Sequence, residues 1–151
     1  MSSVGPAVNE FEKKIKDLTK SKYAVAVVNG TAALHLSLDI LGVNQGDEVL
    51  TQSLNFVAST NAIHQCKATP VFIDVSKETL GMCPDSLSSF LEKECTLTKE
   101  GCLNNKTKRT IKACIPMHTF GFPCSIKEIK EICTKYNIKL VEDAAESLGS
   151  F

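Results

Sequence analysis

The sequence has no excess of charge of either sign. Over 151 residues, 17 lysines and arginines balance 17 aspartates and glutamates. A chain without net charge lacks the general attraction that draws a protein to a nucleic-acid backbone or an acidic membrane surface. We therefore expect neither nucleic acid nor membrane as a partner, and a small molecule fits better.

Long hydrophobic runs are missing as well. The opening stretch, MSSVGPAVNEFEKK, lacks the basic segment and apolar run of a signal peptide, and no later apolar segment approaches the length that spans a bilayer. These absences predict a cytoplasmic protein. The length and the 43% hydrophobic content allow one sizeable core, so a single domain is expected.

Paired cysteines of the metal-binding type are also absent. The seven cysteines are odd in number and contain no CxxC pair, which disfavours a zinc site or a disulfide framework. Cys114 and Cys133 fall within apolar patterns, where a free thiol packs as a small hydrophobic group. We therefore expect reduced thiols and no metal site.

The hydrophobic pattern alternates between the helical and the strand period. It predicts strands in residues 23–28, 46–52, 69–75, 111–117 and 138–143, and helices in residues 8–18, 29–42, 56–66, 84–93 and 125–137. Gly42 is expected to end the second helix. A polar stretch, residues 94–110, has no period and predicts a surface loop or hairpin. Apolar strands that alternate with helices predict an α/β fold with a mostly parallel sheet covered on both faces.

In such sheets, ligands bind beyond the carboxyl ends of the strands. In the stretch VNGTAAL, three small residues, Gly30, Thr31 and Ala32, open a helix directly after a predicted strand. Their N–H groups suit a phosphate at the positive end of the helix dipole. The stretch is neither a Walker A loop nor GxGxxG, which disfavours a nucleoside triphosphate or a dinucleotide. A close packing point without a ligand is the alternative.

Three further strand ends carry candidate residues. Phe56, in QSLNFVAS, would stack on a planar ring or belong to the core. His118, in PMHTFGFP, fits a hydrogen-bonded structural histidine better than an acid or base. Asp143, in KLVEDAAESLGS, would hold a charged nitrogen or cap the residues that follow it. A phosphate cradle, an aromatic ring and a carboxylate together suit pyridoxal 5′-phosphate.

These stretches, in this order, resemble the first part of the DegT/DnrJ/StrS family of pyridoxal-phosphate-dependent sugar aminotransferases, a branch of the aspartate aminotransferase fold. The stretches SSVG, EVLTQSLNFVAS and EDAAESLGS, together with the cysteine-bearing insertion at residues 94–110, are most similar to the LegC group. That group aminates a nucleotide-linked 4-keto-6-deoxy sugar on the route to legionaminic acid and related nonulosonates.

The resemblance implies six cofactor-binding residues: Gly30, Thr31, Ala32, Phe56, Asp143 and Glu146. The first three would hold the phosphate, Phe56 would stack on the pyridine ring and Asp143 would pair with the ring nitrogen. Glu146 matches a position near the substituents of the ring. The resemblance also implies glutamate as amino donor, a UDP- or GDP-linked sugar as substrate, and a homodimer with shared active sites.

In the family, the lysine that forms a Schiff base with the cofactor follows the motif that contains Asp143. The resemblance therefore implies that residues 1–151 are a partial large, cofactor-binding domain, cut at both ends, without the lysine segment or the small C-terminal domain. None of Lys67, Lys112 and Lys139 can replace that lysine, because the last two begin predicted strands at the opposite end of the sheet. The chain by itself is expected to hold cofactor weakly and to be inactive.

Two alternatives stay open from the sequence. One is a stand-alone flavodoxin-like domain that binds another phosphate ligand, although such a domain usually carries different residues after its first strand. The other is a catalytically dead scaffold subunit that pairs with full-length copies.

Overall fold

The computed structural model describes residues 5–150, so Phe151 and most of the SSVG wording lie outside it. The helices are α1 (Pro6–Thr19), α2 (Gly30–Ile40), α3 (Val57–Gln65), α4 (Pro84–Glu94) and α5 (Ile126–Lys135), with a 3₁₀ turn, η1 (Thr119–Gly121). The strands are β1 (Glu48–Gln52), β2 (Thr69–Ile73), β3 (Cys95–Thr98), β4 (Gly101–Asn104), β5 (Thr110–Ile115) and β6 (Lys139–Leu140). All five predicted helices form.

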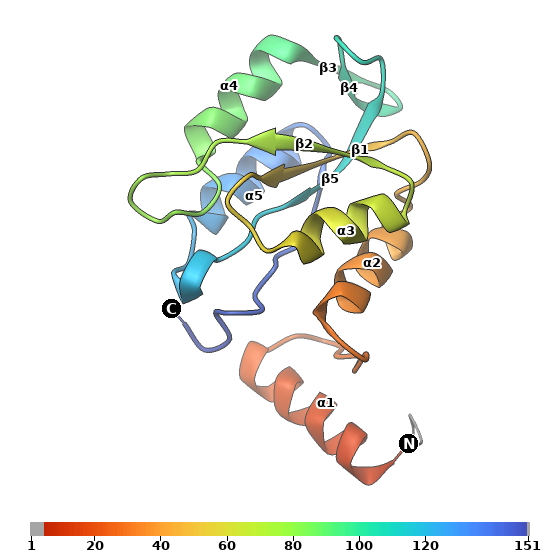
Figure 1. Cartoon of the computed structure of the whole chain (residues 1–151), viewed down its shortest axis with the longest axis vertical. Helices are drawn as coiled ribbons and strands as arrows, with labels where there is room; N and C mark the ends of the chain where they lie inside the picture. The colour runs from red at the N-terminus through yellow and green to blue at the C-terminus, as the bar shows by residue number, and fades with distance from the viewer. Residues whose placement is uncertain (1–4, 151) are drawn as a thin grey trace.

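The strands make one sheet in the order β2-β1-β5-β4-β3, and β6 also pairs with β5 (Figure 1). β1, β2, β5 and β6 are parallel, and Leu50 on β1 lies opposite Val71 and Cys114 on its two neighbours. β3 and β4 form an antiparallel hairpin whose second strand pairs with β5. The predicted α/β fold with a mostly parallel sheet is confirmed, and residues 94–110 contain the hairpin.

Helices cover both faces of the sheet, as the apolar strands predicted. On one face, Leu34 and Leu38 of α2 and Ile63 of α3 pack with Val49 and Ile115 of the strands. On the other face, side chains of α4 and α5 pack with the alternate residues of the same strands; they include Leu50, Leu87, Leu91, Cys114, Ile129 and Cys133. Successive residues of a strand point to opposite faces, so β1 contributes to both cores.

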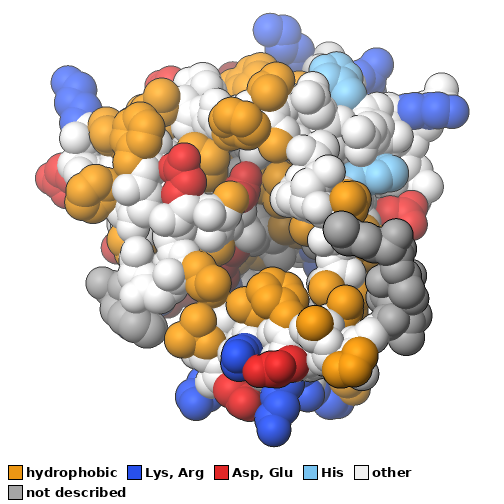
Figure 2. Space-filling model, turned by 60° about the horizontal axis from the view of Figure 1, so that its bottom comes forward, with side chains coloured by type: hydrophobic (Ala, Val, Ile, Leu, Met, Phe, Trp, Pro, Cys, Tyr) orange, Lys and Arg blue, Asp and Glu red, His pale blue; other side chains and the backbone are white. Residues whose placement is uncertain are grey.

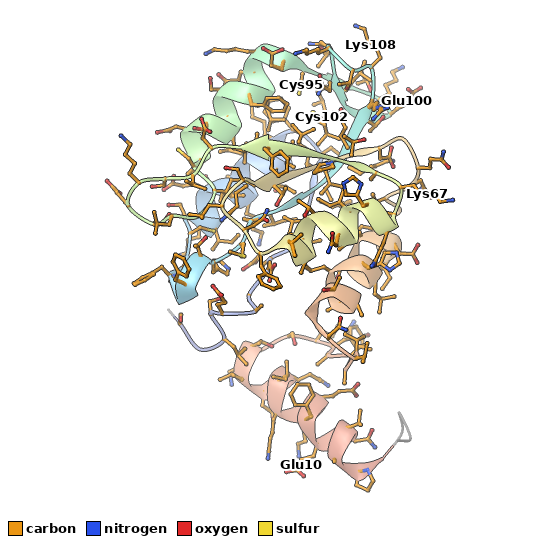
Figure 3. The ribbon with its side chains drawn as sticks, in the orientation of Figure 1. Glu10, Lys67, Cys95, Glu100, Cys102 and Lys108 are labelled. Carbon is orange, nitrogen blue, oxygen red and sulfur yellow. The ribbon has the colours of Figure 1, made fainter. Side chains whose placement is uncertain are left out.

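The cysteines behave as hydrophobic residues. All seven are free, and five of them are buried. Cys114 and Cys133 lie in the core under α4 and α5, as predicted. Cys95 and Cys102 lie in the hairpin, at the end of the molecule far from α1 (Figure 3).

The predicted strand at residues 23–28 does not form. A strand needs a neighbour to bond its backbone, and none of the strands in the described part of the chain pairs with this segment. Val25 and Val28 are instead 72% and 87% exposed, and the N–H of Ala26 donates to Glu12 Oε1 at 2.8 Å. The apolar pattern was therefore misassigned as a strand.

Helix α1 is amphipathic, as predicted, but lies apart from the sheet (Figure 1). None of its residues is buried, and Phe11 and Leu18 are more than half exposed. Figure 2 shows hydrophobic side chains gathered around a hollow on this face of the molecule. Among residues 5–150, no helix combines the length and apolar character needed to cross a membrane.

Candidate cofactor site

The N-terminus of α2 offers two backbone donors. The N–H groups of the first turn of a helix have no partner within the helix. Here Asn29 caps the helix, and its Oδ1 accepts the N–H of Ala32 at 2.9 Å. That bond occupies Ala32, so the N–H groups of Gly30 and Thr31 are the ones left for an anion. The space in front of Gly30 is open, because a Cβ added there would meet no atom within 4 Å.

Phe56 stands directly before α3, beyond the end of β1. Its side chain is 70% exposed, so the alternative that placed it in the core is wrong. Its carbonyl oxygen accepts the N–H of Ser59 at 3.2 Å, which ties Phe56 to the first turn of the helix. The backbone of Phe56 is therefore anchored to α3, and its ring is open to a planar partner.

Asp143 lies beyond β6 and is buried, with 7% of its surface exposed. Its Oδ2 accepts the hydroxyl of Ser59 at 3.0 Å, and its Oδ1 accepts the N–H of Ala145 at 3.3 Å. The second bond is the local one that the capping alternative predicted, although residues 145–149 form a turn and not a helix. A carboxylate can accept about four hydrogen bonds, so Asp143 retains capacity for one more donor.

Glu146 is exposed, and its Oε2 accepts the N–H of Phe120 at 2.7 Å. Phe120 has a positive φ of 55°, an uncommon conformation for a residue with a side chain. The carboxylate of Glu146 thus stabilises this backbone, and the Phe120 ring is left 67% exposed.

His118 is hydrogen-bonded, as the structural alternative predicted. It is buried, and its Nδ1 accepts the N–H of Cys124 at 3.2 Å. The proton must then be on Nε2, which faces Glu142 Oε2 at 3.4 Å. The imidazole ties the loop after β5 to the loop after β6.

Gln52, the last residue of β1, joins three loops and was not singled out from the sequence. It is fully buried. Its Oε1 accepts the N–H groups of Met82 and Met117 at 2.9 and 3.1 Å. Its Nε2 donates to the carbonyl of Leu54 and to Thr119 Oγ1, both at 2.9 Å. A glutamine at the end of an apolar strand, where a hydrophobic residue is expected, was the available signal.

The predicted residues divide between two cavities. Gly30 and Ala144, the neighbour of Asp143, line a cavity of about 540 Å³ next to α1. Phe56 and Glu146 line a smaller one of about 160 Å³, which they share with Leu54, Asn55, Met117, Thr119 and Phe120. The hydrogen bond between Ser59 and Asp143 connects the loop of Phe56 to the segment that carries Ala144 and Glu146. Thr31 and Ala32 line neither cavity.

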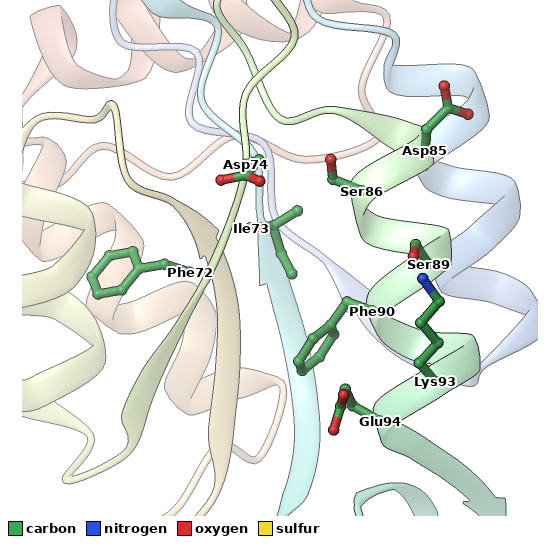
Figure 4. Close-up of a pocket in the computed structure, with 9 residues that line it drawn as sticks. All are labelled: Phe72, Ile73, Asp74, Asp85, Ser86, Ser89, Phe90, Lys93 and Glu94. Atoms are coloured by element: carbon green, nitrogen blue, oxygen red, sulfur yellow. The ribbon is translucent and has the colours of Figure 1, made fainter.

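A third cavity, of about 460 Å³, lies between β2 and α4 (Figure 4). Ile73 points from the strand toward the helix, and Ser89 and Lys93 lie on the helix side. None of the six predicted cofactor-binding residues contributes to it. Nothing in its lining matches the predicted site.

The three lysines lie where the sequence placed them. Lys139 begins β6 and Lys112 lies early in β5, at the end of the sheet opposite Asp143. Lys67 lies in the turn before β2, on the far side of the molecule from the C-terminal segment (Figure 3). None of them can reach the residues gathered at the carboxyl ends of the strands.

Comparison with known proteins is consistent with this geometry. A model of the DegT/DnrJ/EryC1/StrS aminotransferase family matches residues 1–151. The chain is 39% identical to the GDP-perosamine synthase of Escherichia coli O157:H7, over 99% of this chain and 37% of that protein. Among solved structures, a family aminotransferase from Brucella abortus has a TM-score of 0.84 and 32% identity, over 97% of this chain and 37% of its own.

A second solved structure bears on the cofactor. NtdA from Bacillus subtilis, with the cofactor PMP bound, has a TM-score of 0.78 and 27% identity, over 97% of this chain and 30% of its own. The observed sheet is therefore that of these pyridoxal-phosphate-dependent aminotransferases. The chain spans about a third of the length of these relatives.

Proposed function

Because the chain belongs to the DegT/DnrJ/EryC1/StrS aminotransferase family, we propose that it forms part of the large, cofactor-binding domain of a sugar aminotransferase. The substrate class is a nucleotide-linked 4-keto-6-deoxy sugar, which receives an amino group from glutamate. The similarity to a GDP-perosamine synthase supports a nucleotide sugar. It also makes a GDP-linked sugar the first substrate to test. Membership of the LegC group, with a role in the synthesis of legionaminic acid, is a more specific part of the proposal. We also propose that the complete enzyme is a homodimer.

The observation that carries the proposal is the buried Asp143. Its carboxylate accepts a hydrogen bond from Ser59, which lies in the first turn of α3, directly after the exposed Phe56. The donor set fits pyridoxal phosphate. Gly30 and Thr31 would supply N–H groups for the phosphate, Phe56 would cover a face of the ring, and Asp143 has acceptor capacity left for a protonated ring nitrogen. The bound cofactor supplies an electron sink for the carbon that loses a proton.

Asp143 would keep the proton on the ring nitrogen, because a buried carboxylate favours a positive charge beside it. Ser59 would orient that carboxylate, and Phe56 would exclude water from one face of the ring. The family match favours this function over the flavodoxin-like domain. The inactive scaffold subunit is left to the experiment.

The test joins residues 1–150 to the remaining part of the E. coli GDP-perosamine synthase and compares Asp143→Asn with the parent chimera. Asparagine can keep the bonds to Ala145 and Ser59, because the serine hydroxyl can accept as well as donate. The variant should fold and bind cofactor. Its kcat with glutamate and a GDP-linked 4-keto-6-deoxy sugar should fall about 100-fold or more, which corresponds to about 3 kcal/mol.

Asp74→Asn is the matched control, because Asp74 also follows a parallel strand but is exposed. It should keep kcat within about twofold. An Asp143→Asn chimera with normal kcat would leave Asp143 as a turn-forming residue only. A chimera that binds cofactor and has no turnover would favour the scaffold subunit.

A further inference from the structure

The small cavity of about 160 Å³ has an aromatic residue on each of two loops. Phe56 comes from the loop after β1 and Phe120 from the loop after β5, and both rings are at least two-thirds exposed. Apolar side chains that reach solvent in a pair beside a cavity are suited to a planar ligand. The groups that hold the two loops in place therefore decide how these aromatic side chains are presented to a ligand.

The side chain of Gln52 forms hydrogen bonds with both loops. Three of the seven residues that line the cavity are bonded to its side chain: Leu54, Met117 and Thr119. A fourth bond, to the N–H of Met82, brings in the loop before α4. Because Gln52 is the last residue of a central, fully buried strand, it transmits the rigidity of the sheet to these loops.

The orientation of the Gln52 amide is fixed by its partners. Its Oε1 lies between two N–H donors, so it must be the oxygen. Its Nε2 faces the carbonyl of Leu54, which can only accept. Thr119 gives its own proton to the carbonyl of Leu80 at 3.0 Å, so its Oγ1 can only accept from Gln52. A carboxylate at position 52 has no N–H to donate, so it could not bond to the Leu54 carbonyl or to Thr119 Oγ1.

We propose that Gln52 is a positioning residue that fixes the loop of Phe56 relative to the loop of Phe120, so that the exposed Phe56 ring is placed to cover one face of a planar ligand. The backbone of Phe120 is itself held in its left-handed conformation by the bond to Glu146. The inference rests on the proposed function for the identity of the planar ligand, and on the described contacts for the role of Gln52.

The chain provides a matched control on the same strand. Glu48 begins β1 at the opposite end of the sheet, is also buried, and accepts a bond from Asn104 Nδ2 at 2.8 Å. Gln52→Glu and Glu48→Gln therefore exchange the same two side chains at the two ends of β1. Thr119→Val removes one partner of Gln52 in a gentler way, and Thr119→Ser restores the hydroxyl.

The first measurement needs no ligand. The 151-residue chain is digested briefly with chymotrypsin, and cleavage after Phe56 and Phe120 is followed by mass spectrometry, with Phe11 in α1 as the internal reference. Gln52→Glu and Thr119→Val should raise cleavage at both sites by about fivefold or more relative to Phe11, because the loops open more often. Glu48→Gln and Thr119→Ser should stay within about twofold of the parent chain.

The second measurement is binding of pyridoxamine 5′-phosphate, which has no aldehyde to react with surface lysines. Gln52→Glu and Thr119→Val should weaken its binding by about tenfold, and Glu48→Gln and Thr119→Ser should not. If Gln52→Glu is too unstable to purify, the two Thr119 variants decide alone.

The outcomes separate the two ideas. Unchanged cleavage at Phe56 and Phe120 in Gln52→Glu and Thr119→Val overturns the role of Gln52, whatever the ligand does. Equal loosening of these loops in Glu48→Gln also overturns it, because a general loss of stability would then be the cause. Loosened loops in Gln52→Glu and Thr119→Val, together with a parent chain that does not bind pyridoxamine phosphate, support the role of Gln52 and count against binding of the cofactor by this chain.

Discussion

The two ends of the same sheet differ in how they use buried polar side chains. At the amino ends of the parallel strands the described residues include two, Glu48 and Asn104. The carboxyl ends and the segments that follow them hold seven: Thr51, Gln52, Ser59, His118, Thr119, Asp143 and Ser147. Burying a polar group costs free energy unless it is hydrogen-bonded, so the carboxyl ends require many more hydrogen-bond partners than the amino ends.

The bonds at the two ends also differ in what they connect. At the amino end, Asn104 bonds to Glu48, and its Oδ1 accepts the N–H of Lys106 in its own turn. At the carboxyl end, Gln52 and Thr119 join loops 67 residues apart, and Ser59 and Asp143 join segments 84 residues apart. One network anchors a hairpin, whereas the other assembles loops from several strands. The difference indicates where precise loop placement is needed.

Substitution of a glycine at each end of the sheet should give the largest difference in stability between the two ends. Gly121 has a φ of +83°, and a Cβ added there would lie 2.9 Å from the carbonyl oxygen of Glu146. Gly46, before β1, has a φ of +92° and no atom within 4 Å of an added Cβ. Gly121→Ala should lower the free energy of unfolding by about 2–3 kcal/mol, and Gly46→Ala by about 1 kcal/mol. Urea denaturation measures both, and equal losses would show that the packing against Glu146 is unimportant.

Alkaline pH should lower the free energy of unfolding through buried thiols at both ends of the sheet, to different degrees. Burial raises the pKa of the Cys95 thiol in the hairpin to about 12 and that of Cys124, in the loop before α5, to about 11, from an ordinary value of 9.0. The folded chain binds these protons more tightly than the unfolded chain. Their stabilisation is therefore complete below pH 9 and is lost as pH rises toward the folded pKa, by at most about 1.4 kcal/mol per pH unit for each thiol.

Single alanine variants separate the contributions of the two thiols to the pH dependence of stability. Between pH 8 and 11, urea midpoints of Cys95→Ala and Cys124→Ala should fall less steeply with pH than those of the parent chain. The slope should flatten more at the top of the range for Cys95→Ala, because its folded pKa is higher. Parallel slopes for all three proteins would contradict the assignment of the raised pKa values.

The smallest effect is expected at an exposed contact of the amino end. Arg109 Nη1 donates to Thr69 Oγ1 at 2.7 Å, in an exposed position. Arg109→Lys should change the free energy of unfolding by no more than about 0.5 kcal/mol and leave pyridoxamine phosphate binding unchanged. A larger loss would mean that the amino end contributes to the ligand site as well.

Much of the fold follows from local pattern. The helical period placed all five helices and short apolar runs placed the four parallel strands, because an amphipathic helix buries one side whereas a parallel strand in a covered sheet is apolar on both faces. Helix α2 ends as predicted, with the N–H groups of Gly42 and Val43 bonded to Asp39 and Leu38 at 2.9 and 3.0 Å. Residues 23–28 show the limit of this reasoning, because an apolar run becomes a strand only where another strand pairs with it.

The candidate site was predicted in part. Residues at strand ends can be located from the sequence, and Phe56, Asp143 and Glu146 lie in the segments that follow β1 and β6. Gly30 opens α2 after a segment that does not form the predicted strand. Ser59 and Thr119 could not be chosen, because their importance depends on partners far away in the sequence. Ala32 shows the converse, since a local capping bond to Asn29 uses the donor that the phosphate prediction required.

The sequence by itself determined the five helices, the four parallel strands, their order, the α/β class and the resemblance to a family of aminotransferases, because these properties depend on local periodicity and short motifs. Only the tertiary structure decided that the Phe56 ring is exposed, that Glu146 holds the backbone of Phe120, and that Gln52 bonds to three loops. The physical reason is that a side-chain hydrogen bond reaches about 3 Å in space and has no preferred separation along the chain.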